Sequence, residues 1–293
     1  MTVREALNRA QKAFASGNVE DARLESELLL RHALRIGRVQ LYQEPERRLA
    51  PREVASFWRL VERRLGGEPT AYITGRREFY GLSFSVDSGV LIPRPESELL
   101  VDTALQIARR CPVMSVAEIG TGCGAIAIIL ALNLPEVRIY ATDISAPALR
   151  VARLNCQNHG VAYRICLLAG DMLDPLPGPV DLIVANLPYV PQREVSRLGL
   201  ADFEPRLALD GGRDGLEKIA WLCSKIGDRL RPGGFLLLEI GQEQGGAVTA
   251  LLRHLFPSAG IEVFPDLAGI DRVVVLSLAP VESSNSREMQ RVA

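Results

Sequence analysis

The segment Ser115-Val-Ala-Glu-Ile-Gly-Thr-Gly-Cys-Gly-Ala125 decides the fold, because it joins a short apolar run to a helix through three glycines. Residues 115–119 predict a short strand, and residues 124–133 predict a helix. Glycines are needed between them because the backbone turns sharply and a ligand must approach it without meeting a Cβ atom. This strand–loop–helix unit predicts a ligand site at the carboxyl end of a sheet.

The same alternation continues through the rest of the chain. Further strands are predicted at residues 137–142, 163–168, 181–185, 234–239, 261–264 and 272–278, and further helices at 146–158, 215–230 and 244–256. Alternating strands and helices imply an α/β fold whose mostly parallel sheet is covered by helices on both faces.

The first 92 residues follow other periods. Residues 1–66 show helical spacing, with Thr2 and Asp21 as candidate N-caps and a helix that starts near Pro51 and ends at Gly66-Gly67. Residues 77–92 alternate about a central glycine, which predicts a hairpin. A small helical bundle and a hairpin therefore precede the sheet.

Composition excludes several classes of protein. The 293 residues are 47% hydrophobic and 24% charged, which is a globular composition long enough for two domains. The net charge of −1 argues against a protein that grips nucleic acid by bulk charge. No apolar run approaches the roughly 20 residues that cross a bilayer, and the N-terminus lacks a signal-peptide layout. The five cysteines contain no Cys-x-x-Cys pair, which argues against disulfides and zinc and favours the cytoplasm.

Two candidate binding positions follow the next strands. Asp143 ends the second strand about 20 residues after the glycine loop, where a carboxylate accepts hydrogen bonds from a ribose diol. After the third strand, Asp171 is a candidate acceptor for an adenine amino group, and Met172 is placed to pack on the ring. These residues predict a nucleoside ligand and leave both NAD and S-adenosylmethionine open.

The fourth strand runs into Asn186-Leu187-Pro188-Tyr189 at the same edge of the sheet. A planar NH2 group is a poor nucleophile because its lone pair is delocalised. Acceptors on its two N–H bonds, the Asn186 side-chain oxygen and the Leu187 carbonyl, would direct that lone pair towards an electrophilic methyl group, while Tyr189 offers a flat face. Orientation of this kind is worth several kcal/mol. The tetrapeptide therefore predicts methyl transfer to a planar nitrogen.

Several longer strings resemble the release-factor glutamine methyltransferases, and the resemblance spans most of the chain. The strings are residues 67–75, 78–81, 90–96, 204–212, 214–216, 266–269 and 271–272. The resemblance implies a class I methyltransferase domain with a Rossmann-like sheet of seven strands, the last of them antiparallel. It also implies a helical domain over residues 1–75 that helps to hold the substrate protein, a β-hairpin linker over 76–95, the methyltransferase domain over 96–280 and a flexible tail over 281–293.

The resemblance also implies ligands for the site. The cofactor is S-adenosylmethionine, and the substrate is the glutamine of the Gly-Gly-Gln loop in class-1 peptide-chain release factors. Asn186, Leu187, Pro188 and Tyr189 would hold the glutamine amide, with Asn186 and Tyr189 as catalytic residues. The expected cofactor-binding residues, including Asp171 from its strand-end position, are Gly120, Thr121, Gly122, Cys123, Gly124, Asp143, Asp171, Met172 and Asn186.

Two departures from the family pattern bear on activity. Leu187 stands where the family has the first proline of Asn-Pro-Pro-Tyr, so the carbonyl acceptor survives but the rigid φ of proline is lost. Ser97 stands where the family has threonine and keeps the hydroxyl.

Three alternatives stay open: a ribosomal-protein glutamine methyltransferase, an N6-adenine nucleic-acid methyltransferase, and a scaffold that Leu187 has made inactive. We expect a cytoplasmic monomer that contacts no nucleic acid directly, no membrane and no metal.

Overall fold

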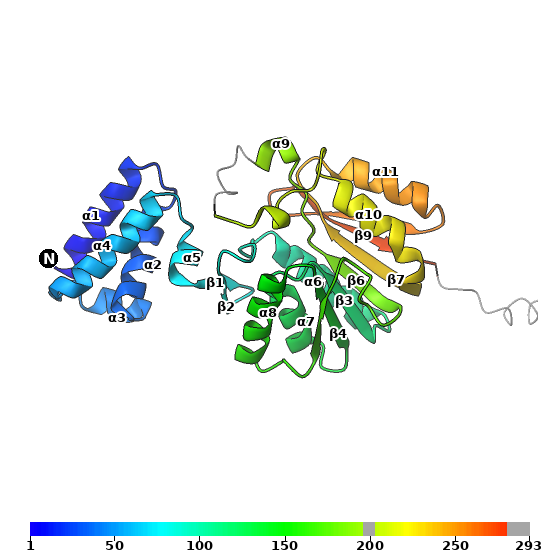
Figure 1. Ribbon diagram of the computed structural model, residues 1–293, viewed down its shortest axis with the longest axis horizontal. Coiled ribbons are helices and arrows are strands. Elements are labelled where there is room, and N and C mark those ends of the chain that lie inside the picture. Colours follow the sequence, from blue (N-terminus) through cyan, green and yellow to red (C-terminus); the bar gives the residue numbers. More distant parts are fainter. Residues whose placement is uncertain (196–202, 280–293) are drawn as a thin grey trace, which may run out of the picture. The chain divides into compact units, whose positions relative to one another are not determined.

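The computed structural model describes residues 1–195 and 203–279 (Figure 1). The chain divides into two compact units, of which the first is Met1–Arg76 and the second begins at Arg77. None of the helices in these two described stretches is long and apolar enough to cross a bilayer. The predicted α/β sheet and the predicted N-terminal helical region are both confirmed.

The first unit is built from helices around a small apolar core. Helix α1 begins with a capping box, in which Thr2 Oγ1 accepts from the Glu5 amide and the Glu5 carboxylate accepts from the Thr2 amide. Phe14, Leu29 and Phe57 are fully buried in the core between these helices. The helices are α1 (Val3–Ser16), α2 (Ala22–Leu34), α3 (Arg38–Gln43), α4 (Pro51–Leu65) and α5 (Thr70–Thr74).

The predicted hairpin consists of β1 (Arg76–Phe79) and β2 (Leu82–Ser85). Its two turn residues, Tyr80 and Gly81, have φ of 52° and 72°, which suits the twist of a tight hairpin. The Tyr80 amide donates to Glu98, and the Tyr80 hydroxyl donates to Asp102 at 2.6 Å. The hairpin turn is thereby fixed to helix α6 (Ser97–Arg110).

The sequence prediction missed helix α6. Its apolar residues recur at helical spacing, and Leu100, Val101, Ala104 and Leu105 are buried. The helical period was therefore present in the sequence, between the string 90–96 and the glycine loop.

The second unit contains the predicted sheet, with the strand order β5-β4-β3-β6-β7-β9-β8. Its strands pair in parallel except at β9, which is antiparallel to both β7 and β8. The predicted antiparallel last strand is confirmed. The strands are β3 (Ser115–Ile119), β4 (Arg138–Asp143), β5 (Ile165–Ala169), β6 (Val180–Ala185), β7 (Leu230–Glu239), β8 (Gly260–Pro265) and β9 (Asp271–Ser277).

Helices cover both faces of the sheet. One face carries α6, α7 (Ala125–Asn133) and α8 (Ala146–Asn158), and the other carries α10 (Glu217–Lys225) and α11 (Gly245–Leu255) (Figure 1). Short helical turns occur at α9 (Gln192–Val195), η2 (Arg206–Ala208) and η3 (Ile226–Asp228).

The order of strands places the site. The chain runs outward from β3 through β4 to β5, and then returns to place β6 on the other side of β3. Loops that leave β3 and β6 therefore turn to opposite faces and open a crevice at the carboxyl ends of the strands. The glycine loop and the Asn186 tetrapeptide follow these two strands.

Candidate active site

The glycine loop follows β3 and has a backbone that side chains disfavour. Gly120, Gly122 and Gly124 have φ of 73°, 56° and 83°. Gly120 and Gly122 line the pocket described below, whereas a Cβ on Gly124 would lie 3.2 Å from the Ala152 Cβ on α8. The first two glycines therefore leave the ligand side open, and the third allows α7 to pack closely on α8.

Asp143 at the end of β4 fixes this loop from the other side. One carboxylate oxygen accepts from the Gly122 amide at 2.8 Å, and the other accepts from the Ser145 amide at 2.8 Å. Burial raises the pKa of Asp143, and the backbone amides partly offset that effect. A carboxylate has about four lone-pair sites in all, so this one, which lines the pocket, can still accept from a ligand.

Glu118 supports the loop from within the protein. Its carboxyl accepts from the Thr121 hydroxyl at 2.5 Å and from the Ala127 amide at 3.0 Å. Burial raises the pKa of Glu118 to about 8. The Thr121 side chain thus faces a buried carboxyl on the side of α7.

Cys123 also faces the interior. Its side chain is buried, its carbonyl accepts from the Asn155 side chain at 2.9 Å, and burial raises the pKa of its thiol to about 12. A thiol held protonated in this way is no nucleophile at neutral pH.

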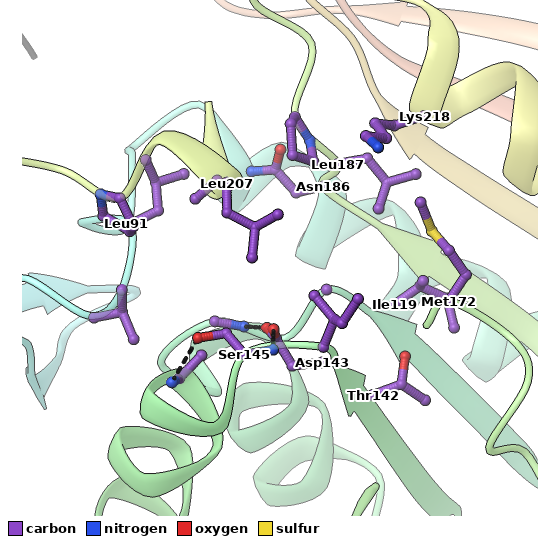
Figure 2. A pocket seen from close by; sticks show the side chains of 18 of the residues that line it. Leu91, Ile119, Thr142, Asp143, Ser145, Met172, Asn186, Leu187, Leu207 and Lys218 are labelled. Atoms are coloured by element: carbon purple, nitrogen blue, oxygen red, sulfur yellow. Dashed lines mark hydrogen bonds between the residues drawn. The ribbon is translucent and has the colours of Figure 1, made fainter. Parts of the chain in front are cut away.

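The pocket lies between the glycine loop and the segment after β6 (Figure 2). Asp143 and Ser145 lie on one side of it, and Asn186 and Leu207 lie on the opposite side. The predicted residues that line it are Gly120, Gly122, Asp143, Asp171, Met172, Asn186, Leu187 and Pro188.

Asn186 is held by helix α6. Its side-chain Nδ2 donates to the Ser97 hydroxyl at 2.9 Å. Leu187 also lines the pocket, but its side chain is 3% exposed and packs into the core of the sheet.

Four predicted residues, Thr121, Cys123, Gly124 and Tyr189, are not part of the pocket lining within the described chain. Tyr189 packs against the core, and its hydroxyl donates to Glu239 at 3.4 Å. Burial raises the pKa of Tyr189. Its predicted stacking on a substrate amide stays a prediction.

Further lining residues come from segments to which the sequence assigned no binding role. Residues 89–91 and the residues Pro205, Leu207 and Ala208 form part of the wall. They belong to or adjoin two strings that carried the resemblance, and the Arg94–Glu204 ion pair joins those strings at 2.6 Å. Lys218 on α10 also lines the pocket, and no pattern in the sequence marks it.

Comparison with known proteins identifies the family. Residues 5–75 match the family model described as "PrmC N-terminal domain", and residues 95–202 match the "Methyltransferase small domain" model. A release factor glutamine methyltransferase from Moorella thermoacetica is 46% identical over 275 residues, which are 93% of this chain and 97% of the relative. The chain belongs to the release factor glutamine methyltransferase family. The resemblance inferred from the sequence strings is thereby confirmed.

Other relatives agree with this family. A release factor glutamine methyltransferase from Koribacter versatilis is 38% identical and covers 94% of this chain and 98% of its own length. Among solved structures, a ribosomal protein L11 methylase from Lactobacillus delbrueckii subsp. bulgaricus is 22% identical, with a TM-score of 0.50 over 66% of this chain and 84% of its own. At that identity the solved structure supports the methyltransferase fold alone.

Proposed function

We propose that this protein transfers a methyl group from S-adenosylmethionine to the side-chain amide nitrogen of a glutamine in peptide-chain release factors. The observation that carries the proposal is that Asn186, held at one wall of a pocket, faces across it to Asp143 and the glycine loop. The names of relatives that match nearly the whole chain support the same reaction and substrate.

The residues of the pocket fit this cofactor. Gly120 and Gly122 present bare backbone, against which a ligand can lie without meeting a side chain. Asp143 would accept from the ribose hydroxyls and Asp171 from the adenine amino group, while Met172 provides an apolar surface for the ring. When bound, S-adenosylmethionine supplies an electrophilic methyl group.

The tetrapeptide would orient the nucleophile. Asn186 Oδ1 accepts one N–H of the substrate amide, and the Leu187 carbonyl accepts the other. With both N–H bonds engaged, the nitrogen lone pair is held towards the cofactor side of the pocket. Both acceptors also stabilise the positive charge that develops on the nitrogen before it loses a proton, so no strong base is needed beforehand.

The substrate glutamine is that of the Gly-Gly-Gln loop, and the N-terminal helical domain over residues 1–75 helps to hold the release factor. The enzyme acts as a monomer in the cytoplasm, where it contributes to translation termination.

The test is mass spectrometry of a class-1 release factor incubated with this protein and S-adenosylmethionine. We expect a gain of one methyl mass that maps to the Gly-Gly-Gln glutamine, and no gain in a factor whose glutamine is replaced by glutamate. Cofactor binding without methyl gain would refute the proposed substrate and would direct the assay to ribosomal proteins and to adenine in nucleic acids.

Leu187→Pro is expected to preserve or improve turnover and to reduce stability. The Leu187 amide makes no hydrogen bond to another described residue, so proline removes no backbone partner there. The buried side chain is shortened, however, and this lowers the free energy of unfolding by about 1–3 kcal/mol. Steady-state kinetics and denaturant titration measure the two effects.

Leu187→Ala is the matched control, because it loses the same packing without fixing φ. A large loss of turnover in Leu187→Pro alone would show that the local backbone is built around leucine.

A further inference from the structure

Ser97 connects Asn186 to a buried carboxyl that the reaction described above does not use. Ser97 is the first residue of α6 and is 3% exposed. Its hydroxyl accepts a hydrogen bond from Asn186 Nδ2 at 2.9 Å. A serine hydroxyl that accepts one hydrogen bond still has its own proton to donate. The acceptor of that proton decides the direction of the whole chain of hydrogen bonds.

Glu239 is the buried carboxyl beside Ser97. It ends β7, next to β6 in the sheet, is 1% exposed, and has the Ser97 hydroxyl as a hydrogen-bonding neighbour. Its Oε1 accepts a hydrogen bond from the Tyr189 hydroxyl at 3.4 Å. Its Oε2 has no hydrogen-bond partner among the described residues. The Ser97 hydroxyl is a neighbouring group with a proton left to donate to this carboxylate.

We propose that Ser97 and Glu239 are positioning residues that fix the orientation of the Asn186 amide. The inference rests on the proposed role of Asn186. An ionised Glu239 can only accept, so Ser97 must donate to it and must accept from Asn186 Nδ2. Asn186 Oδ1 is then the atom left to face the substrate amide. If the Asn186 side-chain amide were flipped by 180°, it would present its own N–H groups to the N–H groups of the substrate.

Protonation of Glu239 reverses this order. A protonated carboxyl can donate to Ser97, which then donates to Asn186 Oδ1 and releases Nδ2 towards the pocket. Burial and Glu96 raise the pKa of Glu239 to about 7, against the lowering effects of Ser97, Tyr189 and Arg272. Turnover should therefore fall as the pH drops through about 7, because the proton-bound form presents the wrong atom.

Nuclear magnetic resonance tests the link without any turnover. In the wild type, the Asn186 side-chain NH2 signals should shift with the same pH midpoint as the Glu239 carboxyl carbon. In Ser97→Ala the Glu239 pKa should rise and the Asn186 signals should no longer follow it, and Ser97→Thr should restore both.

The matched control is Thr103→Val, which removes a buried hydroxyl of the same helix that bonds the Leu99 carbonyl at 2.8 Å. It should change neither titration. Independent titration of Asn186 and Glu239 in the wild type, or unchanged titrations in Ser97→Ala, would overturn the proposal.

Kinetics provides the second readout. Ser97→Ala should lower kcat about tenfold, the cost of one misdirected hydrogen bond, while calorimetry gives an unchanged cofactor Kd. Ser97→Thr should recover most of that loss, and Glu239→Gln should abolish the fall in turnover below pH 7. If Glu239→Gln keeps that fall, Glu239 is not the group that titrates and the inference fails. A wild type without methyl transfer refutes the proposed function instead, and the resonance experiment still decides the link.

Discussion

Asn186→Ala is expected to lower the turnover of methyl transfer by about a hundredfold or more while cofactor affinity changes only a few-fold. The variant removes the acceptor that orients the substrate nitrogen and stabilises its developing charge, and loss of one such preorganised group typically costs 10²–10³ in kcat. The cofactor keeps Asp143 and the glycine loop, which do not depend on the Asn186 side chain. Single-turnover kinetics and calorimetry measure the two quantities separately.

Asn133→Ala is a suitable control for the loss of an asparagine. Asn133 ends α7, and its side chain donates to the Ile129 carbonyl of its own helix at 2.9 Å. It should leave turnover unchanged. Turnover retained in Asn186→Ala would remove Asn186 from the catalytic assignment, and an equal loss in both variants would indicate general destabilisation.

Asp143→Ala should weaken binding of S-adenosylmethionine by about 1–3 kcal/mol, or roughly five- to 150-fold. The substitution removes the expected acceptor for the ribose hydroxyls. It also leaves the Gly122 and Ser145 amides without the carboxylate that now accepts from both. The effect therefore combines a lost ligand contact with a loosened glycine loop, and calorimetry with the cofactor measures their sum.

Asp143→Asn separates these contributions. Its one remaining oxygen can serve one of the two amides, whereas its NH2 group opposes the other, so we expect an intermediate loss of affinity. Equal affinity in all three proteins would mean that Asp143 holds the loop and does not bind the cofactor.

The sequence predicted those parts of the site that follow from strand order. Asp143 ends one strand, and Asp171 and Asn186 follow the next two along the chain. The carboxyl ends of parallel strands share one edge, so the meeting of these residues could be expected without coordinates. The sequence could not predict that Leu91 and Leu207 form a wall of the pocket, because irregular loops have no period that shows which way a side chain points.

The sequence also could not predict which way the side chains of the glycine loop point. Thr121 stands between two pocket-lining glycines and Cys123 directly follows the second, yet the Thr121 hydroxyl bonds Glu118 and the Cys123 side chain is buried. Spacing alone does not distinguish a residue that supports a loop from one that touches a ligand. The link from Ser97 to Glu239 joins residues 142 positions apart, and only the packing of α6 on β7 brings them together.

The position of β9 has a consequence for how the protein is made. During synthesis on the ribosome, β7 and β8 both emerge before β9, the strand that lies between them. Until residues 271–277 arrive, β7 presents one open row of backbone donors and acceptors, and such an edge is a template for pairing with other chains. The sheet that carries the active site is therefore completed late in synthesis. Until then, pairing of the open β7 edge with other chains competes with folding.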